Sequence, residues 1–432
     1  MLRRIVFPSA LVLLTTLPAA QPQESNQGTL RLISGLPDYI QPSGLIEASP
    51  GLFLSVGQPP GGGEAVFSVT AKGATNTLTS FPSGYNLSGF PVGGPNGRFY
   101  DGVGYHSNSG NMFSVSTVPG VKEYSTQTFV PFLSQAIPDG MLLGAGVGPT
   151  GWNLATCNKD GVVTSVYSFP SGDFVEQPVV YATDGNYYGI DLTATGGYVY
   201  QSTPSGSLAK LHTFPNGAFI GSSPAPLLQA SDGNLYGAAL YDGANRTGTI
   251  YSVSLAGQYS VVYTFPKGPA GFPTSLIQAS DGNLYGTTLG NTQASKGHSV
   301  MFRLTTSGQY TQLYAWPYSV CQCYLVQGSD GNIYGIGQQG GGFFVWEGGL
   351  PKPAPQAPSF TPSSGAAGTQ VLIWGYNLLS PSVSFNGVAA AKVTGSGPQY
   401  IRATVPAGAT TGPITVTTPG GTYTTTTSFT VQ

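Results

Sequence analysis

One short pattern recurs along the chain and limits the folds that it can adopt. The stretch S-D-G-N-L-Y-G stands at residues 231–237 and again, letter for letter, at 280–286. T-D-G-N-Y-Y-G at 183–189 and S-D-G-N-I-Y-G at 329–335 are close variants, and three weaker copies precede them. Seven copies at a nearly constant spacing predict a repeat architecture. The shared glycines lie 43 to 49 residues apart, at Gly51, Gly97, Gly140, Gly185, Gly233, Gly282 and Gly331.

Each copy is accompanied by further segments with the pattern of β-strands. An apolar run precedes the motif, as in S-L-I-Q-A at 275–279, and an alternating run follows it, as in V-M-F-R-L at 300–304. A last run ends in Phe-Pro, as in V-V-Y-T-F-P at 261–266. β-Branched and aromatic residues at a period of two predict strands. With the motif's own strand, each period holds four strands, which is the content of one β-propeller blade.

The two ends of the repeat region predict how the ring closes. The seventh copy supplies three strands, the last of them at 343–346, and lacks a fourth. The segment T-L-R-L-I-S-G-L-P at 29–37 has the pattern of a fourth strand without the three that should precede it. Pairing the two would leave neither edge free. We therefore predict an all-β fold, with a seven-bladed β-propeller over residues 21–350 that is closed by an N-terminal strand.

The repeated motif itself is interpreted as architecture. Asp-Gly would form the tight turn between the first and second strands, because glycine allows a positive φ and aspartate accepts hydrogen bonds within the turn. Leu235 would then face one neighbouring blade and Tyr236 the other. The alternative is a cation held by the aspartates. It is disfavoured because each turn has only one carboxylate.

The repeats resemble the GloVer-type tandem repeats of bacterial secreted proteins. The matching residues include S-D-G-N-L-Y-G-T-T at 280–288, V-M-F-R-L-T at 300–305 and Y-A-W-P at 314–317. The resemblance extends over residues 29–347, and the first three copies are degenerate. It implies β-propeller-like repeats in a bacterial secreted protein. It implies no catalytic residues.

The composition changes after the Pro-rich stretch at 351–358, which we interpret as a stiff linker. No acidic residue follows Glu347. Short alternating segments, such as V-L-I-W-G at 371–375 and P-I-T-V-T-T at 413–418, predict a small antiparallel sandwich. We expect this sandwich to cover residues 359–432.

This C-terminal segment resembles an IPT/TIG domain. The resemblance is carried by G-T-Q-V-L-I-W-G-Y-N-L at 368–378, V-S-F-N-G-V-A-A at 383–390 and V-P-A-G-A-T-T-G-P-I-T-V at 405–416. It implies an immunoglobulin-like fold that serves as a spacer or an auxiliary binding module. Without Asp, Glu, His or Cys, the segment has no groups for acid–base or metal chemistry.

The first 20 residues have the features of a signal peptide. Arg3 and Arg4 precede an apolar run at 5–17, and the small residues Ala19 and Ala20 follow it. This predicts a secreted or cell-envelope protein, and no later stretch is long enough to span a membrane. Only 7% of the residues are charged. No basic cluster exists, so nucleic acid is not an expected partner. We expect a monomer.

The cysteines and histidines do not form a recognisable metal or cofactor site. Three cysteines, at 157, 321 and 323, cannot make a full disulfide framework, and the favoured interpretation is that they are small buried apolar residues. Two neighbouring cysteines without a nearby histidine make a poor metal site. His212 stands where other copies have tyrosine, so we expect a packed strand residue. No cofactor or metal is expected.

One pair of acidic residues is a candidate for catalysis. Asp173 and Glu176 lie in S-G-D-F-V-E-Q-P, and paired carboxylates cleave glycosides when they face a cleft at a suitable separation. The alternative is that both are solvated surface residues. No nucleophile elbow or phosphate-binding loop is present. The sequence therefore leaves open whether the protein is an enzyme, and favours that it is not.

Strand order assigns the connections to two faces of the predicted propeller. Turns within the blades, such as 231–234, lie on what we call the turn face. The loop face carries the connections between second and third strands, such as 287–298, and those between consecutive blades. Each connection between blades carries an aromatic residue, which could stack on a sugar or grip a peptide, or could fill the gap between blades. These residues are Tyr39, Tyr85, Phe132, Phe174, Phe219, Phe272 and Tyr318.

The favoured function is that of a secreted or cell-surface binding or adhesion protein. Few charges and many Tyr, Asn and Ser residues suit a neutral polyol, so polysaccharide is the preferred ligand, and a surface protein is the other candidate partner. The TIG-like domain would be a spacer or auxiliary module. The alternatives are a polysaccharide-active lyase or hydrolase and a purely structural envelope protein.

Overall fold

The computed structural model describes residues 28–432 apart from short gaps. The gaps are 35–39, 60–61, 88–90, 106–108, 118–120, 126–129, 149–150, 176–177, 194–195, 216–225, 268–270, 291–297, 317–322, 338–341 and 395–396. The predicted signal peptide, 1–20, lies outside the described residues. Within them the structure is built of β-strands, with a single turn of 3-10 helix, η1 (Pro138–Gly140). No helix of the described part is long and apolar enough to cross a membrane.

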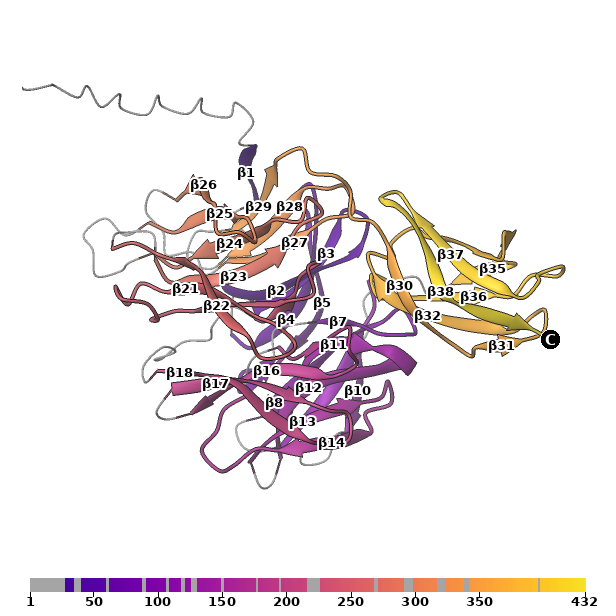
Figure 1. Cartoon of the computed structure of the whole chain (residues 1–432), viewed down its shortest axis with the longest axis horizontal. Coiled ribbons are helices and arrows are strands. Elements are labelled where there is room, and N and C mark those ends of the chain that lie inside the picture. The colour runs from indigo at the N-terminus through magenta and orange to yellow at the C-terminus, as the bar shows by residue number, and fades with distance from the viewer. Residues whose placement is uncertain are drawn as a thin grey trace, which may run out of the picture.

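In the described part of residues 29–347, the strands form seven antiparallel sheets, which we number as repeat sheets 1 to 7 in chain order (Figure 1). Sheet 1 contains β2 (Ile40–Ser49), β3 (Leu52–Gln58), β4 (Glu64–Thr70) and β5 (Thr75–Phe81). Sheet 2 contains β6 (Tyr85–Leu87), β7 (Val92–Gly93), β8 (Phe99–Tyr105), β9 (Ser109–Val115) and β10 (Val121–Ser125). Sheet 3 contains β11 (Val130–Ile137), β12 (Met141–Gly148), β13 (Gly151–Cys157) and β14 (Val163–Ser168).

The later sheets repeat the same order. Sheet 4 contains β15 (Val180–Tyr181), β16 (Tyr187–Thr193), β17 (Gly196–Ser202) and β18 (Leu208–Phe214). Sheet 5 contains β19 (Leu228–Gln229), β20 (Leu235–Ala239), β21 (Thr249–Val253) and β22 (Tyr259–Thr264). Sheet 6 contains β23 (Pro273–Gln278), β24 (Leu284–Thr288), β25 (Val300–Leu304) and β26 (Tyr310–Ala315). Sheet 7 contains β27 (Cys323–Gln327), β28 (Ile333–Gly337), β29 (Gly342–Glu347) and β1 (Thr29–Ser34).

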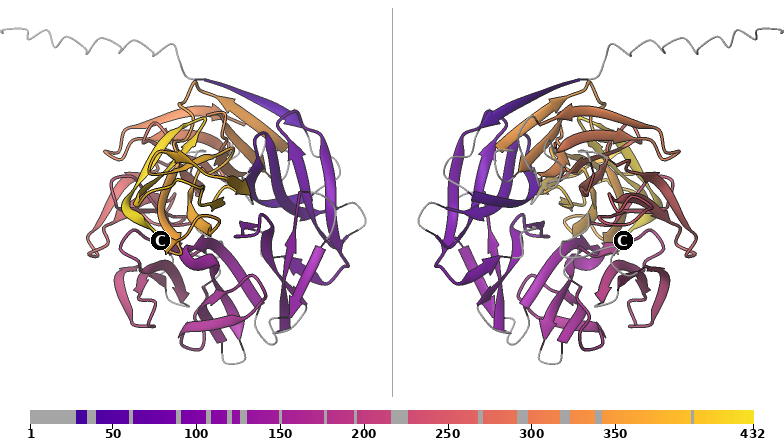
Figure 2. Two further views of the ribbon diagram at one scale, coloured as in Figure 1. Left: turned by 90° about the vertical axis from the view of Figure 1, so that its right-hand side faces the viewer. Right: turned by 90° about the vertical axis from the view of Figure 1, so that its left-hand side faces the viewer.

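The repeat sheets stand side by side around a common centre, so the arrangement is propeller-like (Figure 2). Second strands such as β20 are buried along their whole length, whereas fourth strands such as β22 alternate between exposed and half-buried residues. Clusters of apolar side chains between neighbouring sheets form the core; one of them joins Tyr236 of sheet 5 to Phe302 of sheet 6. Both faces of each sheet are therefore covered, which explains the high content of aromatic and β-branched residues.

The N-terminal strand pairs with the last repeat, as the sequence predicts. β1 runs antiparallel to β29, with Leu30 opposite Trp346 and Leu32 opposite Phe344. An ion pair of 3.0 Å between Arg31 and Glu347 lies on the same junction. The first strand of the repeat region therefore completes the sheet formed by its last three strands.

The Asp-Gly turns have the predicted geometry. The four full motifs place glycine at positive φ, between 81° and 97°, at Gly185, Gly233, Gly282 and Gly331. Asp232 shows the shared hydrogen-bond pattern: Oδ1 accepts the Asn234 N–H (3.0 Å), and Oδ2 accepts the Asn234 side-chain amide (3.2 Å) and the Tyr236 hydroxyl (2.7 Å). These bonds engage both carboxylate oxygens, so the turn aspartates are structural residues.

The last glycine of the motif is required by close packing. In sheet 6 a Cβ at Gly286 would collide with the ring of Phe302, and in sheet 5 a Cβ at Gly237 would collide with Tyr251. These rings come from the third strand, which lies directly opposite the glycine. The motif therefore forms a turn at its start, and its last glycine leaves room for an aromatic ring that lies over the backbone.

The C-terminal unit, residues 356–432, contains two sheets. One is formed by β30 (Gln356–Thr361), β32 (Gln370–Tyr376), β36 (Tyr400–Thr404) and β35 (Lys392–Thr394). The other is formed by β31 (Ser364–Gly365), β38 (Gly421–Val431), β37 (Gly412–Thr418), β33 (Ser382–Phe385) and β34 (Val388–Ala389). Side chains such as Ile373 and Phe429 fill the core of this unit. β30 begins inside the Pro-rich stretch 351–358, so strand pairing starts before the predicted linker ends.

The C-terminal unit packs directly on repeat sheets 2 and 3. Trp374 and Tyr400 share an apolar cluster with Leu133 of β11. The Trp374 indole donates to the Ala136 carbonyl (2.9 Å), and the Tyr400 hydroxyl donates to the Ile137 carbonyl. In Figure 1 the unit lies against one side of the ring. The contact is a shared core, so the unit is held by more than its covalent connection.

Both described cysteines are buried, as predicted, but one of them is not a free thiol. Cys157 is free and buried, and burial raises the pKa of its thiol to about 12. Cys323 is also buried and is disulfide-bonded. Three cysteines do not make a framework, but a single bridge needs only one pair.

Candidate functional site

The C-terminal unit packs on one face of the ring and not on the other. The residues that it contacts, Pro95 and Ala136–Ile137, lie at the turns between first and second strands. In an antiparallel sheet, the connection after the second strand lies at the opposite end of the sheet from the turn between the first and second strands. The loop face is therefore on the side away from the C-terminal unit, and the turn face is partly covered by it.

Phe174 on the loop face has the most accessible aromatic ring described. It lies between sheets 3 and 4, is 52% exposed, and is the one aromatic residue among the exposed large apolar side chains of the described part. Two backbone hydrogen bonds fix it to β16: its N–H donates to the Leu192 carbonyl (2.8 Å), and the Leu192 N–H donates to its carbonyl (2.9 Å). Its ring centroid is 6.4 Å from that of Trp152. The ring is presented to solvent by a backbone that is itself held in place.

A pair of carboxyl groups lies beside this bridge. Asp173 precedes Phe174 and is half-buried, whereas Asp191 lies on β16 and is completely buried (0% exposed). Neither carboxylate oxygen of Asp191 accepts a hydrogen bond from the described residues. Burial is the main cause that raises the pKa of Asp191 to about 7, with the Tyr198 hydroxyl lowering it and the Asp173 carboxyl raising it. Asp191 is thus a buried acid whose charge is not compensated by a direct partner.

The groups around Asp191 are a phenol and an ammonium. Tyr198 on β17 stands directly opposite Asp191 in the strand register, and burial together with the Asp191 carboxylate raises the pKa of its hydroxyl. The Lys210 ammonium lies 3.8 Å from the centroid of the Tyr198 ring. Its charge lowers the pKa of Asp191 but is the smallest of the effects on that group. The lysine therefore faces the ring, and the described ion pairs do not include it.

The structure describes only one member of the sequence-predicted catalytic pair, Asp173. Glu176 lies outside the described residues, and the carboxyl group near Asp173 is that of Asp191. Sequence reasoning missed Asp191 because it compared acids within one loop. A comparison of the repeats contains the signal: the positions equivalent to Asp191 are Ala239, Thr288 and Gly337. Sheet 4 alone among the four full motifs carries an acid there.

The structure describes some of the predicted loop-face aromatics and leaves others out. Tyr85 is half-buried, with its ring centroid 6.1 Å from that of Phe81. Phe272 is half-buried at φ 66°, with its ring centroid 5.2 Å from that of Tyr241. Phe132 is a strand residue of β11, paired with Ala145. The predicted residues outside the described part are Tyr39, Phe219 and Tyr318.

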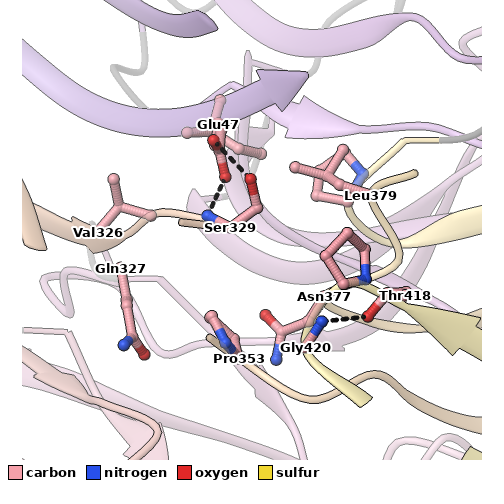
Figure 3. A pocket seen from close by; sticks show the side chains of 12 residues that line it. Glu47, Val326, Gln327, Ser329, Pro353, Asn377, Leu379, Thr418 and Gly420 are labelled. Carbon is pink, nitrogen blue, oxygen red and sulfur yellow. Dashed lines mark hydrogen bonds between the residues drawn. The ribbon is translucent and has the colours of Figure 1, made fainter. Parts of the chain in front are cut away.

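A hollow lies between the ring and the C-terminal unit (Figure 3). Its volume is about 100 Å³, and its lining includes Glu47, Ser329, Asn377 and Leu379. Glu47 accepts hydrogen bonds from the N–H groups of Gly51 (2.8 Å) and Ser329 (2.7 Å) and from the Ser329 hydroxyl (3.0 Å). Burial raises its pKa against the effect of these donors. Because both oxygens are already engaged, this carboxylate joins sheets 1 and 7.

His212 has the packed position that the sequence predicts. Its ring is stacked on that of Tyr259, with centroids 3.6 Å apart and planes at 3°. Burial lowers its pKa, and the charge of Asp242 acts in the opposite direction. His212 therefore belongs to the contact between sheets 4 and 5.

Comparison with known proteins supports the repeat resemblance and the propeller-like fold. The family model described as the Gloeobacter/Verrucomicrobia repeat matches residues 140–347. A fungal alcohol oxidase of the AA5 family in complex with copper is similar at 12% identity and a TM-score of 0.50, over 93% of this chain and 99% of the other. YCF48 bound to D1 peptide is similar at 13% identity and a TM-score of 0.48, over 75% of this chain and 96% of the other.

An extracellular domain is also among the similar structures. The domain belongs to a putative hybrid two-component system of Bacteroides thetaiotaomicron, and the match has 11% identity and a TM-score of 0.49. It covers 94% of this chain and 57% of that one. At 12% identity, the similarity to the alcohol oxidase concerns the fold alone. No curated protein matches the sequence.

Proposed function

We propose that this chain is a secreted or cell-surface binding protein whose loop face holds a neutral ligand, with polysaccharide as the preferred class. In this proposal the repeat sheets are the blades of one seven-bladed propeller. The C-terminal unit is an immunoglobulin-like sandwich of the IPT/TIG type. The signal-peptide pattern of residues 1–20 supports secretion.

The observation that carries the proposal is the exposed ring of Phe174 on a fixed backbone. A flat apolar ring that is already held in place loses little conformational entropy when a sugar stacks on it. The half-buried Asp173 next to it supplies a hydrogen-bond acceptor for a hydroxyl group. A largely uncharged surface suits such a ligand, since only 7% of the residues are charged.

The C-terminal unit supports the choice of face. It packs on the turn face through Trp374 and Tyr400, which leaves the loop face on the opposite side. Because the contact is a shared apolar core, we assign to the unit a fixed structural role, with any ligand binding of its own as an auxiliary function.

The burial of Asp191 argues against hydrolysis by the Asp173–Asp191 pair. A catalytic acid must reach the glycosidic oxygen, and Asp191 is 0% exposed. The Asp173–Asp191 pair therefore gives no support to the lyase or hydrolase alternative.

The test is retention of residues 21–432 on insoluble and immobilised polysaccharides, with the supernatant assayed for released sugars. We expect retention without release, and a Phe174→Ala variant that binds about 10-fold more weakly, which corresponds to about 1.4 kcal/mol. Val162→Ala is the matched control, because Val162 is an exposed apolar residue (61%) away from the loop face.

Other outcomes have definite meanings. Released sugars would replace binding with catalysis. If both variants are retained equally well, the ligand binds at a place other than Phe174. If no polysaccharide retains the protein, a protein partner or a structural role takes the place of this proposal.

A further inference from the structure

Asp191 differs from the other aspartates of the repeat in what surrounds it. The turn aspartates Asp184, Asp232, Asp281 and Asp330 each accept bonds from an asparagine and a tyrosine. Both oxygens of Asp191 are buried and accept none from the described residues. A buried ionised carboxylate without a partner is costly, so its charge must be compensated by a proton or by a cation.

The neighbouring groups form a set of oxygen ligands. Asp191 and Tyr198 face each other across β16 and β17, and Asp173 is brought to them by the Phe174–Leu192 bridge. Carboxylate oxygens, without a thiol or imidazole among the neighbouring groups, are ligands that hard cations prefer, and the Tyr198 hydroxyl adds one neutral oxygen to them.

Lys210 does not fill this role. Its ammonium lies over the face of the Tyr198 ring, 3.8 Å from the centroid, and so interacts with the ring. One lysine beside two carboxyl groups would in any case leave a negative charge in the cluster. The comparison of repeats points the same way, because Ala239, Thr288 and Gly337 show that the fold does not require an acid at this position.

We propose that Asp191, Asp173 and the Tyr198 hydroxyl oxygen bind a hard metal cation such as Ca²⁺ at the junction of repeat sheets 3 and 4. Ca²⁺ tolerates irregular sets of oxygen ligands and keeps water in the remaining positions. The ion would tie the connection that carries Asp173 and Phe174 to β16. The cation site shares Asp173 with the proposed loop-face ligand site, but its test uses no polysaccharide, so the two proposals can fail separately.

The experiment measures thermal unfolding and metal content of residues 21–432. The protein is stripped with EDTA, passed through a desalting column and titrated with CaCl₂ at constant ionic strength and neutral pH. We expect one Ca²⁺ per chain by elemental analysis and a rise in Tm of at least about 2 °C at saturation, because a ligand that binds only the folded state stabilises it. MgCl₂ at the same concentration should give a smaller shift.

Variants locate the ion. Asp191→Asn and Asp173→Asn should each abolish the Ca²⁺-dependent rise in Tm, and Tyr198→Phe should reduce it. Asp191→Ala is a second variant, needed if the side-chain amide of Asp191→Asn disturbs packing. Alanine is the residue that sheet 5 has at this position. Asp232→Asn is the matched control, since Asp232 is a turn aspartate already engaged by Asn234 and Tyr236; it should keep the full rise.

Two results would overturn the proposal. One is a Tm of the original protein that does not respond to Ca²⁺ while Asp191→Asn is more stable than the original chain at neutral pH; a shared proton would then compensate Asp191. The other is a Ca²⁺-dependent rise that survives in both Asp191→Asn and Asp191→Ala, which would place the ion elsewhere.

Discussion

At the scale of single residues, a tyrosine hydroxyl has a hydrogen-bonding role at one position of the repeat and none at another. Tyr236 is buried and donates its hydroxyl to the turn aspartate Asp232 (2.7 Å). Tyr251 is also buried, but its hydroxyl oxygen has no hydrogen-bond partner among the described residues. In sheets 6 and 7 the position of Tyr251 is occupied by Phe302 and Phe344. The ring is therefore the common requirement at that position, and the hydroxyl is not.

This contrast gives a matched pair of variants. Tyr236→Phe should lower the free energy of unfolding by about 1 kcal/mol, because it removes one hydrogen bond and leaves the Asp232 carboxylate with fewer donors. Tyr251→Phe should leave stability unchanged or raise it by up to about 1 kcal/mol, since it removes a buried hydroxyl that has no partner. Urea denaturation of both variants measures the two changes. Equal losses of unfolding free energy in both variants would contradict the different roles given to the two hydroxyl groups.

At the scale of strands and sheets, hydrogen bonds from first strands join neighbouring sheets. Gln278 on β23 accepts the Ser231 N–H (2.8 Å) and donates to the Ser231 hydroxyl (3.1 Å) of the preceding sheet. Gln229 and Gln327 make the equivalent bonds to Thr183 and Ser280. At the junction of sheets 7 and 1 the equivalent residue is Glu47, which bonds to Ser329.

The acid at this junction predicts a pH dependence. Burial raises the pKa of Glu47 above 4.5, so the folded state binds its proton more tightly than the unfolded state does. The resulting stabilisation is complete below about pH 4.5 and is lost as the pH rises through the raised pKa. The free energy of unfolding of Glu47→Gln, minus that of the original chain, should therefore become more positive from pH 4 upward and then level off. Denaturation at a series of pH values measures this difference; a constant or falling difference would contradict it.

The repeat could be predicted from sequence to the level of strands and turns, but the contacts between sheets could not. Period-two apolar patterns and Asp-Gly turns are local signals, and they placed β1 on β29 correctly. Gln278 lies in the run S-L-I-Q-A, which the sequence identifies by its apolar residues, and no sequence signal singled out Glu47, although both stand four residues before the turn glycine. Asp191 and Asp173 are 18 residues apart in the sequence and meet only because Phe174 bridges to Leu192.

At the scale of the whole molecule, the structure depends on two long-range contacts. The C-terminal unit shares a core with sheets 2 and 3, through Trp374 and Tyr400. The sequence predicted the β-rich unit but not this contact, because Trp374 and Tyr400 fit the pattern of ordinary strand residues. The second contact is the pairing of β1 with β29, in which Leu30 packs in the cluster of Trp346 and Ile33 in that of Phe343.

Removing β1 tests the second contact. A chain that lacks residues 29–34 should have a Tm lower by several degrees, because Leu30 and Ile33 lose partners and β29 becomes a free edge. Size-exclusion chromatography should also show self-association through that edge. A chain that lacks only residues 21–27 is the control and should behave like the original. An unchanged Tm and a monomeric profile after the loss of 29–34 would show that the closing strand is dispensable.

The pairing of β1 with β29 also sets an order of events in time. Arg31 and Glu347 are 316 residues apart, so the strand that is synthesised first waits for nearly the whole repeat region before its partner exists. Closing so large a loop is a late and slow step of folding. During that interval both strands are unpaired edges, which other chains can join. Arg31 on β1 and Glu347 on β29 place opposite charges on these two strands, which disfavours the pairing of either strand with its own copy in another chain.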